Sequence, residues 1–218
     1  MYVKTASSSR ENILKKIKQA LAKPVPLPFE ETSKNQAFFI NKGEPELQFA
    51  ENFAALQGRF SFCADEAELV HQLQTLFGTR QWTKLFVNEQ SIRELFTRQH
   101  LELPSGINLA DCDASITSCE CLIARTGSML LSSAQTGRTS SVYAPVHICI
   151  AYTGQLVFDL KDGFELIKKK YPSGTPSLIT FASGPSRTAD IEKTLVTGVH
   201  GPKEVFCFLV ENRGNDAV

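Results

Sequence analysis

The chain has 218 residues, enough for one large domain or two small ones that fold without a disulfide or a metal. Hydrophobic residues make up 42% and charged residues 21%, a balance that argues against a disordered chain. Lysine and arginine together number 23, as do aspartate and glutamate, so the formal net charge is zero. A broad nucleic-acid-binding surface is therefore not expected.

The amino-terminal 50 residues are predicted to form an amphipathic helix followed by a proline-containing arm. Residues 8–11 fit a capping box, and apolar residues then recur at helical spacing opposite a face of lysines. Pro24, Pro26 and Pro28 end this helix, because proline lacks the backbone donor that a helix needs. The helix either folds back on its own domain or docks on a partner or a second copy of the chain.

Neither a signal peptide nor a membrane span is expected. The start of the chain lacks the apolar run of a signal peptide, and apolar clusters such as 205–210 are too short to cross a bilayer. We therefore expect a cytoplasmic protein whose six cysteines are reduced. The cysteines lack the C-x2-C spacing of an iron–sulfur cluster, and Cys119 and Cys121 are predicted to share one face of a strand.

Residues 51–218 are predicted to form one domain, whose first half alternates strands and helices. Strands are predicted at 58–63, 84–87 and 107–109. Helices are predicted after the capping residue Asp65 and at 91–99, the second one capped near Asn88. This alternation implies parallel strands with helices on the faces of the sheet.

The second half of the domain is predicted to contain several short strands separated by glycine-containing turns. These strands are predicted at 114–124, 128–132, 141–143, 147–152 and 156–157, and they are expected to pair antiparallel. A helix at 159–170, a strand at 177–181 and a final strand at 204–210 complete the chain. The pattern predicts an α/β core with a β-rich insertion.

The densest polar cluster follows the predicted strand at 177–181. A glycine that permits close backbone approach is followed by hydroxyls and a guanidinium, in the order Gly184, Ser186, Arg187 and Thr188. Ligands of open parallel sheets bind beyond the carboxyl ends of the strands, and arginine can hold a phosphate or a carboxylate in a bidentate manner. The loop is thus a candidate anion site; alternatively, Arg187 pairs with Asp190 and a hydroxyl caps a helical turn.

A second polar turn, at 198–202, places His200 between two glycines just before the final strand. Such a histidine can act as an acid, a base or a metal ligand, or it can simply bond to the backbone of its own turn. Asp190, Glu192 and His200 are the candidate catalytic residues. They could together bind a divalent ion, but the spacing typical of a metal motif is absent, and no metal is expected.

Several segments resemble the signature of the LUD-domain family. They are Ile116-Thr117, Thr126-Gly127-Ser128, the string GPSRTADIE at 184–192 and the string GVHGP at 198–202. The length and the helical amino terminus resemble the lactate utilisation protein C (LutC/YkgG) type of this family. The resemblance implies a three-layer α/β fold like that of the NagB/RpiA/CoA-transferase group, with a mixed sheet and an antiparallel β-rich insertion. It also implies a place in a bacterial system that oxidises L-lactate to pyruvate.

The same resemblance implies which residues contact a ligand and which partners the chain has. The implied ligand-binding residues are Thr126, Gly127, Gly184, Ser186, Arg187, Thr188 and Gly201. Iron–sulfur clusters are expected in partner subunits, with no cofactor in this chain, and a homo-oligomer is a further option. Arg125 stands where the family usually carries an acidic residue, so it is expected to add a second cation to the pocket.

Two functions follow from these expectations. The first is a non-redox accessory subunit of L-lactate oxidation, which binds iron–sulfur subunits, a small anionic ligand, or both. The second is an independent enzyme of the sugar-phosphate isomerase or CoA-transferase type, in which the 186–188 segment binds phosphate and Asp190, Glu192 or His200 acts as acid or base. This alternative rests on fold analogy, which does not determine function.

Overall fold

The computed structural model describes residues 15, 44–104, 106–188 and 196–211. Apart from residue 15, the predicted amino-terminal helix lies outside the described residues, as do most of the arm, Asp190 and Glu192. The chain divides into two units, Met1–Ile40 and Asn41–Val218, and the following account concerns the second. Within the described part, no helix is long and apolar enough to cross a membrane.

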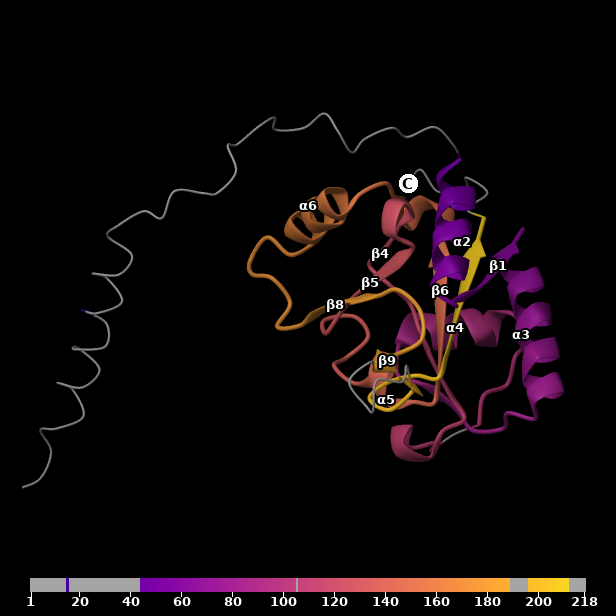
Figure 1. The fold of residues 1–218 in the computed structure, drawn as a ribbon. Coiled ribbons are helices and arrows are strands. Elements are labelled where there is room, and N and C mark those ends of the chain that lie inside the picture. Colours follow the sequence, from indigo (N-terminus) through magenta and orange to yellow (C-terminus); the bar gives the residue numbers. More distant parts are fainter. Residues whose placement is uncertain (1–14, 16–43, 105, 189–195, 212–218) are drawn as a thin grey trace, which may run out of the picture. The chain divides into compact units, whose positions relative to one another are not determined.

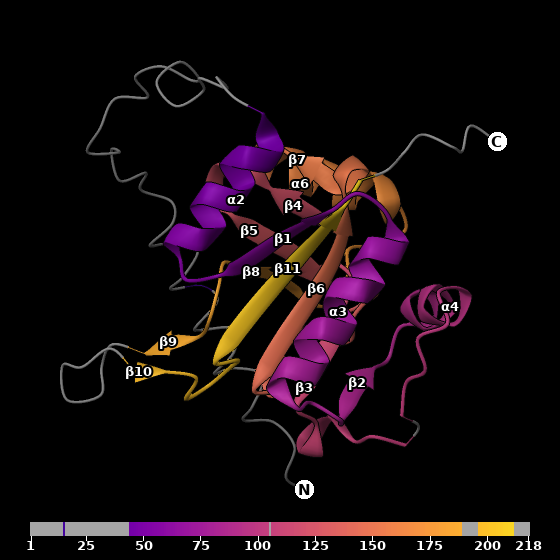
Figure 2. The same ribbon diagram turned by 90° about the vertical axis from the view of Figure 1, so that its right-hand side faces the viewer.

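Five parallel strands form the larger sheet, in the order β1-β11-β6-β3-β2 (Figures 1 and 2). Their bounds are β1 (Arg59–Cys63), β2 (Leu85–Val87), β3 (Ala114–Thr117), β6 (Val146–Tyr152) and β11 (Glu204–Val210). The parallel pairing agrees with the alternation of strands and helices in the sequence. Strands β6 and β11 were predicted to within one residue.

Helices α3 (Glu66–Arg80) and α4 (Gln90–Arg98) pack on one face of this sheet and bury a hydrophobic cluster that includes Leu69 and Leu73. The Asp65 carboxylate caps α3 and accepts a hydrogen bond from the Glu68 amide at 2.9 Å, as predicted. Helix α4 begins after Glu89, without the predicted side-chain cap near Asn88. Helix α4 is therefore stabilised mainly by the packing of its buried residues Ile92, Leu95 and Phe96, and not by a side-chain cap.

The additional strands form a second, four-stranded sheet, in the order β7-β4-β5-β8. Its bounds are β4 (Cys121–Ile123), β5 (Ser128–Ser132), β7 (Leu156–Val157) and β8 (Ile179–Ala182). Strand β5 pairs antiparallel with β4 and β8, and β7 pairs parallel with β4. Helix α6 (Leu160–Lys170) covers the outer face of this sheet, as Figure 1 shows. The expected α/β class, with a parallel sheet and additional antiparallel strands, is confirmed.

The layer between the two sheets is a second hydrophobic cluster, to which helix α2 (Pro45–Ala55) also contributes. Phe49 and Phe53 of α2 are fully buried in it, with their rings stacked 5.4 Å apart. The domain boundary predicted between residues 50 and 51 falls inside this helix. The compact unit thus takes in residues that the sequence analysis assigned to the arm.

Several local predictions were wrong. Residues 107–109 form no strand; Asn108 instead caps a 3-10 helix, Leu109–Asp111, by accepting a hydrogen bond from the Ala110 amide at 3.2 Å. The segment predicted as one strand at 114–124 is divided between β3 and β4, which belong to different sheets. Residues 141–143 lie in a one-turn helix, α5 (Ser140–Tyr143), and not in a strand. Strand β6 was expected to pair antiparallel, but it pairs parallel with both of its neighbours, β3 and β11.

Cys119 and Cys121 do not share a face. Cys119 lies between the two sheets, whereas Cys121 lies in the cluster beneath α6. The reason is that Cys119 belongs to the connection between β3 and β4, so the alternation of a single strand does not apply to it. All six cysteines are buried and carry free thiols.

Candidate functional site

Two polar segments singled out in the sequence lie side by side. The Ser186 amide donates to the carbonyl of Pro202 at 2.9 Å, and the Gly198 amide donates to the carbonyl of Ser186 at 2.8 Å. Strand β9 (Arg187–Thr188) also pairs antiparallel with β10 (Val196–Thr197), and Figure 2 shows the pair near the start of β11. Backbone hydrogen bonds therefore hold the first segment against the second.

A cavity of about 340 Å³ opens where these segments meet the two sheets. Five of the predicted site residues line it: Gly184, Ser186, Arg187, His200 and Gly201. Its walls also include His147 of β6, Val205 of β11 and Thr180 of β8. The cavity thus lies at the amino-terminal ends of β6 and β11, and not at the carboxyl edge of the parallel sheet, where the general rule had placed it.

Two glycines allow the backbone to come close at this cavity. Gly184 has φ +120°, and a Cβ atom there would lie 2.5 Å from the carbonyl oxygen of Leu56. A Cβ atom on Gly201 would lie 2.7 Å from the Cβ of Ser186. Since such contacts are far shorter than van der Waals distance, a larger residue at either position would push the segments apart.

His147 lines the same cavity. Its side chain is fully buried, and Nε2 lies 2.8 Å from the Thr117 Oγ1 atom. Burial lowers the pKa of the imidazole to about 4, so the ring is neutral at physiological pH. The other ring nitrogen, Nδ1, is buried and has no hydrogen-bond partner among the described residues.

The remaining predicted ligand contacts do not converge on this cavity. Thr126 and Gly127 belong to a turn packed against α2, where Asn52 donates to the carbonyls of Ala124 and Arg125 at 2.9 and 3.1 Å. A hydrogen bond of 2.6 Å between the Ser128 and Ser183 hydroxyls links this turn to the cavity wall only indirectly. Thr188 pairs with Val196 in the hairpin. The turn at Thr126 and Gly127 therefore supports the loop at Ser183 and does not itself line the cavity.

Arg125 does not supply the second cation expected in the pocket. Its guanidinium lies 2.8 Å from the Asp159 carboxylate, which also caps α6 by accepting a hydrogen bond from the Leu160 amide at 2.6 Å. The side chain of Asp159 is only 10% exposed. The hydrogen bond from Arg125 holds the pKa of Asp159 below its ordinary value, against the opposing effect of burial.

This pair should make stability depend on pH in a defined direction. The pKa of Asp159 is lower in the folded chain than in the unfolded chain, so its stabilisation is present above about pH 4 and is lost as the pH falls through the folded-state pKa. We expect Asp159→Asn to lower the free energy of unfolding by about 1–2 kcal/mol at pH 7. Urea denaturation at pH 7, 5 and 3 should show this difference shrinking at the lowest pH; a constant difference would contradict the assignment.

A buried polar network, which the sequence analysis missed, follows the carboxyl ends of β2 and β3. The Glu120 side chain is fully buried, and it accepts hydrogen bonds from Lys170 and Tyr171 at 2.7 Å each and from the Ser132 hydroxyl. Glu89 accepts from the amide and the hydroxyl of Ser118, and burial raises its pKa.

The two carboxylates are connected. The Gln135 amide lies within hydrogen-bond distance of both the Ser118 hydroxyl and the Glu120 carboxylate. Glu89 and Glu120 lie 31 positions apart in the chain, so only the pairing of β2 with β3 brings them together. Because the polar groups of this network hydrogen-bond to one another, we assign it a structural role.

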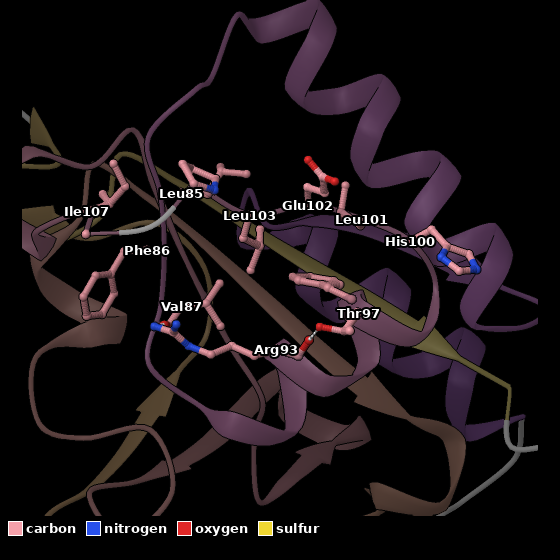
Figure 3. A pocket seen from close by; sticks show the side chains of 13 residues that line it. Leu85, Phe86, Val87, Arg93, Thr97, His100, Leu101, Glu102, Leu103 and Ile107 are labelled. Carbon is pink, nitrogen blue, oxygen red and sulfur yellow. Dashed lines mark hydrogen bonds between the residues drawn. The ribbon is translucent and has the colours of Figure 1, made fainter.

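A larger cavity, of about 650 Å³, lies between the edge strand β2, helix α4 and the segment after α4 (Figure 3). In that view, Phe86 lies near one end of the cavity and His100 near the other. Arg93 lines it but donates to the carbonyl of Val87, and much of the remaining lining is aliphatic. Specific small-molecule sites combine an apolar wall with convergent polar groups. The cavity beside Arg187 fits that description better.

Comparison with known proteins supports the resemblance seen in the sequence. The family model described as the LUD domain matches residues 47–210. An uncharacterized protein of Neisseria meningitidis is 29% identical over 91% of both chains. Lactate utilization protein C of Deinococcus radiodurans is 34% identical, and that of Bacillus subtilis is 35% identical. These two matches span only about half of each chain, 49% and 50% for the former and 46% and 43% for the latter.

A solved structure has a similar fold. The crystal structure of a DUF162 family protein from Deinococcus radiodurans superposes with a TM-score of 0.56 and 21% sequence identity. The match covers 76% of this chain and 96% of that one. At this level of identity, the comparison establishes the shared fold alone.

Proposed function

Because this chain belongs to the LUD-domain family, we propose that it serves the oxidation of L-lactate to pyruvate in the bacterial cytoplasm. In this proposal it is an accessory subunit without redox chemistry of its own. It associates with iron–sulfur subunits, which carry the clusters, and it binds a small anionic ligand in the cavity beside Arg187. The relatives named lactate utilization protein C support the lactate-related role.

One observation carries the ligand-binding part of the proposal: two of the segments that resemble the family signature, 184–188 and 198–202, meet at a single cavity. Arg187 brings a guanidinium to its rim and His200 an imidazole, both on exposed residues. A guanidinium suits a carboxylate or a phosphate, because its planar donors match two oxygens at once. The alternative, an isomerase or a CoA transferase, is supported by fold analogy alone.

Lactate-dependent electron transfer by the iron–sulfur subunits tests the proposal. Under anaerobic conditions, we expect the rate to fall when this chain is left out, and to fall at least fivefold when Arg187→Ala replaces the wild type. Loss of a charge-assisted hydrogen bond of about 1.5–3 kcal/mol accounts for an effect of this size.

Arg98→Ala is the matched control for this experiment. Arg98 is an exposed arginine on α4 that pairs with Glu66 at 3.2 Å, and it does not line the cavity. This variant should leave the rate unchanged. An undiminished rate without the chain would overturn the accessory role. Equal losses of rate in the two variants would show that Arg187 is not part of the binding site.

A further inference from the structure

We infer that His147 forms the inner end of the binding site beside Arg187 and donates a hydrogen bond from Nδ1 to an unprotonated oxygen of a small organic acid. The carboxylate of this ligand is bound at the rim by Arg187. The inference rests on the proposed function, and it adds the chemical class of the ligand and a residue that the sequence did not assign to the site.

The first observation is the burial of an unpaired polar atom. Both nitrogens of His147 lie in a side chain with no exposed surface, yet only Nε2 has a partner among the described residues. A buried polar atom without a partner is costly, and folded proteins rarely leave one unpaired without a reason. His147 is among the residues that line the cavity. In this inference its Nδ1 atom faces the cavity, and a ligand at the inner end supplies the missing partner.

The second observation identifies Nδ1 as a donor. The hydrogen bonds of the described residues give the Thr117 hydroxyl no acceptor other than the His147 Nε2 atom. If the Thr117 hydroxyl donates its proton to Nε2, then Nε2 is the acceptor nitrogen of the neutral imidazole. The ring proton must then reside on Nδ1. The opposite tautomer would leave a hydroxyl proton unsatisfied as well as Nδ1. The geometry therefore favours an Nδ1–H group that needs an acceptor.

The ligand class follows from the two ends of the site. An inner N–H donor and an outer guanidinium both require acceptor oxygens, so an amine or a cation does not fit. Ser141 and Thr180 also line the cavity, and its volume of about 340 Å³ admits a small organic molecule. A 2-oxo acid has the required groups, a carboxylate and a carbonyl oxygen without a proton. The corresponding 2-hydroxy acid must also place a hydroxyl proton, so it should bind more weakly.

Calorimetric titration with pyruvate, with L-lactate as the comparison, tests this assignment on the full chain. We expect pyruvate to bind more tightly than L-lactate. His147→Asn keeps an N–H donor at the position of Nδ1 and should bind pyruvate within about threefold of wild type. His147→Gln reaches instead towards Thr117 and leaves the inner end without a donor, so binding should weaken about tenfold.

Imidazole nitrogen NMR of the wild-type chain provides a second readout, which does not depend on how the variants fold. We expect the His147 proton on Nδ1 and a shift of that resonance when pyruvate is added. A proton on Nε2, no response to pyruvate, or equal affinities for His147→Gln and His147→Asn would each overturn the inference.

Failure of this inference can be separated from failure of the proposed function. If pyruvate does not bind but Arg187→Ala still slows lactate-dependent electron transfer, the accessory role stands and the ligand assignment falls. If pyruvate binds through His147 but the rate of electron transfer does not change when this chain is left out, the ligand site is supported and the accessory role is wrong.

Discussion

Lys170→Met is expected to lower the free energy of unfolding by about 2–4 kcal/mol at pH 7, since it leaves the carboxylate of Glu120 buried without its cation. The Glu120 side chain has no exposed surface, so water cannot replace the lost partner. The side chain of Lys170 is 47% exposed, which places the expected effect below that of a fully buried ion pair. Tyr171 and Ser132 still donate to the carboxylate and limit the loss further.

Urea denaturation provides the measurement, and Lys161→Met is the matched control. Lys161 lies on the same helix and pairs with Glu165, but the two side chains are 82% and 64% exposed and 3.9 Å apart. Removing this cation should change stability by less than about 0.5 kcal/mol. Similar losses in the two variants would show that the Glu120 network contributes no more than a surface pair.

Gly184→Ala should destabilise the chain by about 2–4 kcal/mol and weaken ligand binding at the cavity. Two costs combine at this position: φ is +120°, and the added methyl group would meet the carbonyl oxygen of Leu56 at 2.5 Å. The residue can escape the clash only if the 183–188 segment moves away from Leu56, and that movement would displace Arg187.

Gly174→Ala separates the two costs. Gly174 also has a positive φ, +150°, but nothing lies within 4 Å of the position that an added methyl group would take. Its substitution should therefore cost about 1 kcal/mol from backbone strain alone and leave pyruvate binding unchanged. Thermal denaturation and titration of both variants check this pair of expectations. A Gly184→Ala chain as stable as Gly174→Ala would show that the segment adapts without cost.

The fold was predictable where local chemistry determines structure. The Asp65 cap marks the start of α3, and Asp159 with Asp162 forms a capping box at the start of α6. Prediction failed where tertiary pairing decides the outcome. Residues 114–124 were predicted as one strand, but the chain crosses from one sheet to the other near Cys119. Residues 141–143 were predicted as a strand, whereas backbone hydrogen bonds to the carbonyl of Thr139 close a helical turn there.

The site was predictable in part for the same reason. Glycines, hydroxyls and an arginine close together in sequence identified the 184–188 segment, and its juxtaposition with His200 follows from the pairing of β9 with β10. The sequence could not identify His147 as a site residue, because its partner Thr117 lies 30 positions away on a neighbouring strand. Likewise, the contact of Arg125 with Asp159 depends on where α6 packs. The spacing of residues along the chain does not predict contacts such as His147 with Thr117 or Arg125 with Asp159, because these depend on tertiary packing.

The burial of the cysteines has a consequence for a protein proposed to work beside iron–sulfur subunits. Burial raises the pKa of Cys63 and Cys121 to about 12. A hydrogen bond with Cys149, together with burial, holds the pKa of Cys119 well above its ordinary value. The pKa of Cys149 is also raised well above its ordinary value, because the hydrogen bond with Cys207 and burial outweigh the lowering effect of the hydrogen bond with Cys119. The ionised sulfur is the form that captures iron or reacts with peroxide. In the folded chain these four thiols can therefore stand next to labile clusters without stripping metal from them, and they become competitors only when the packing around them opens.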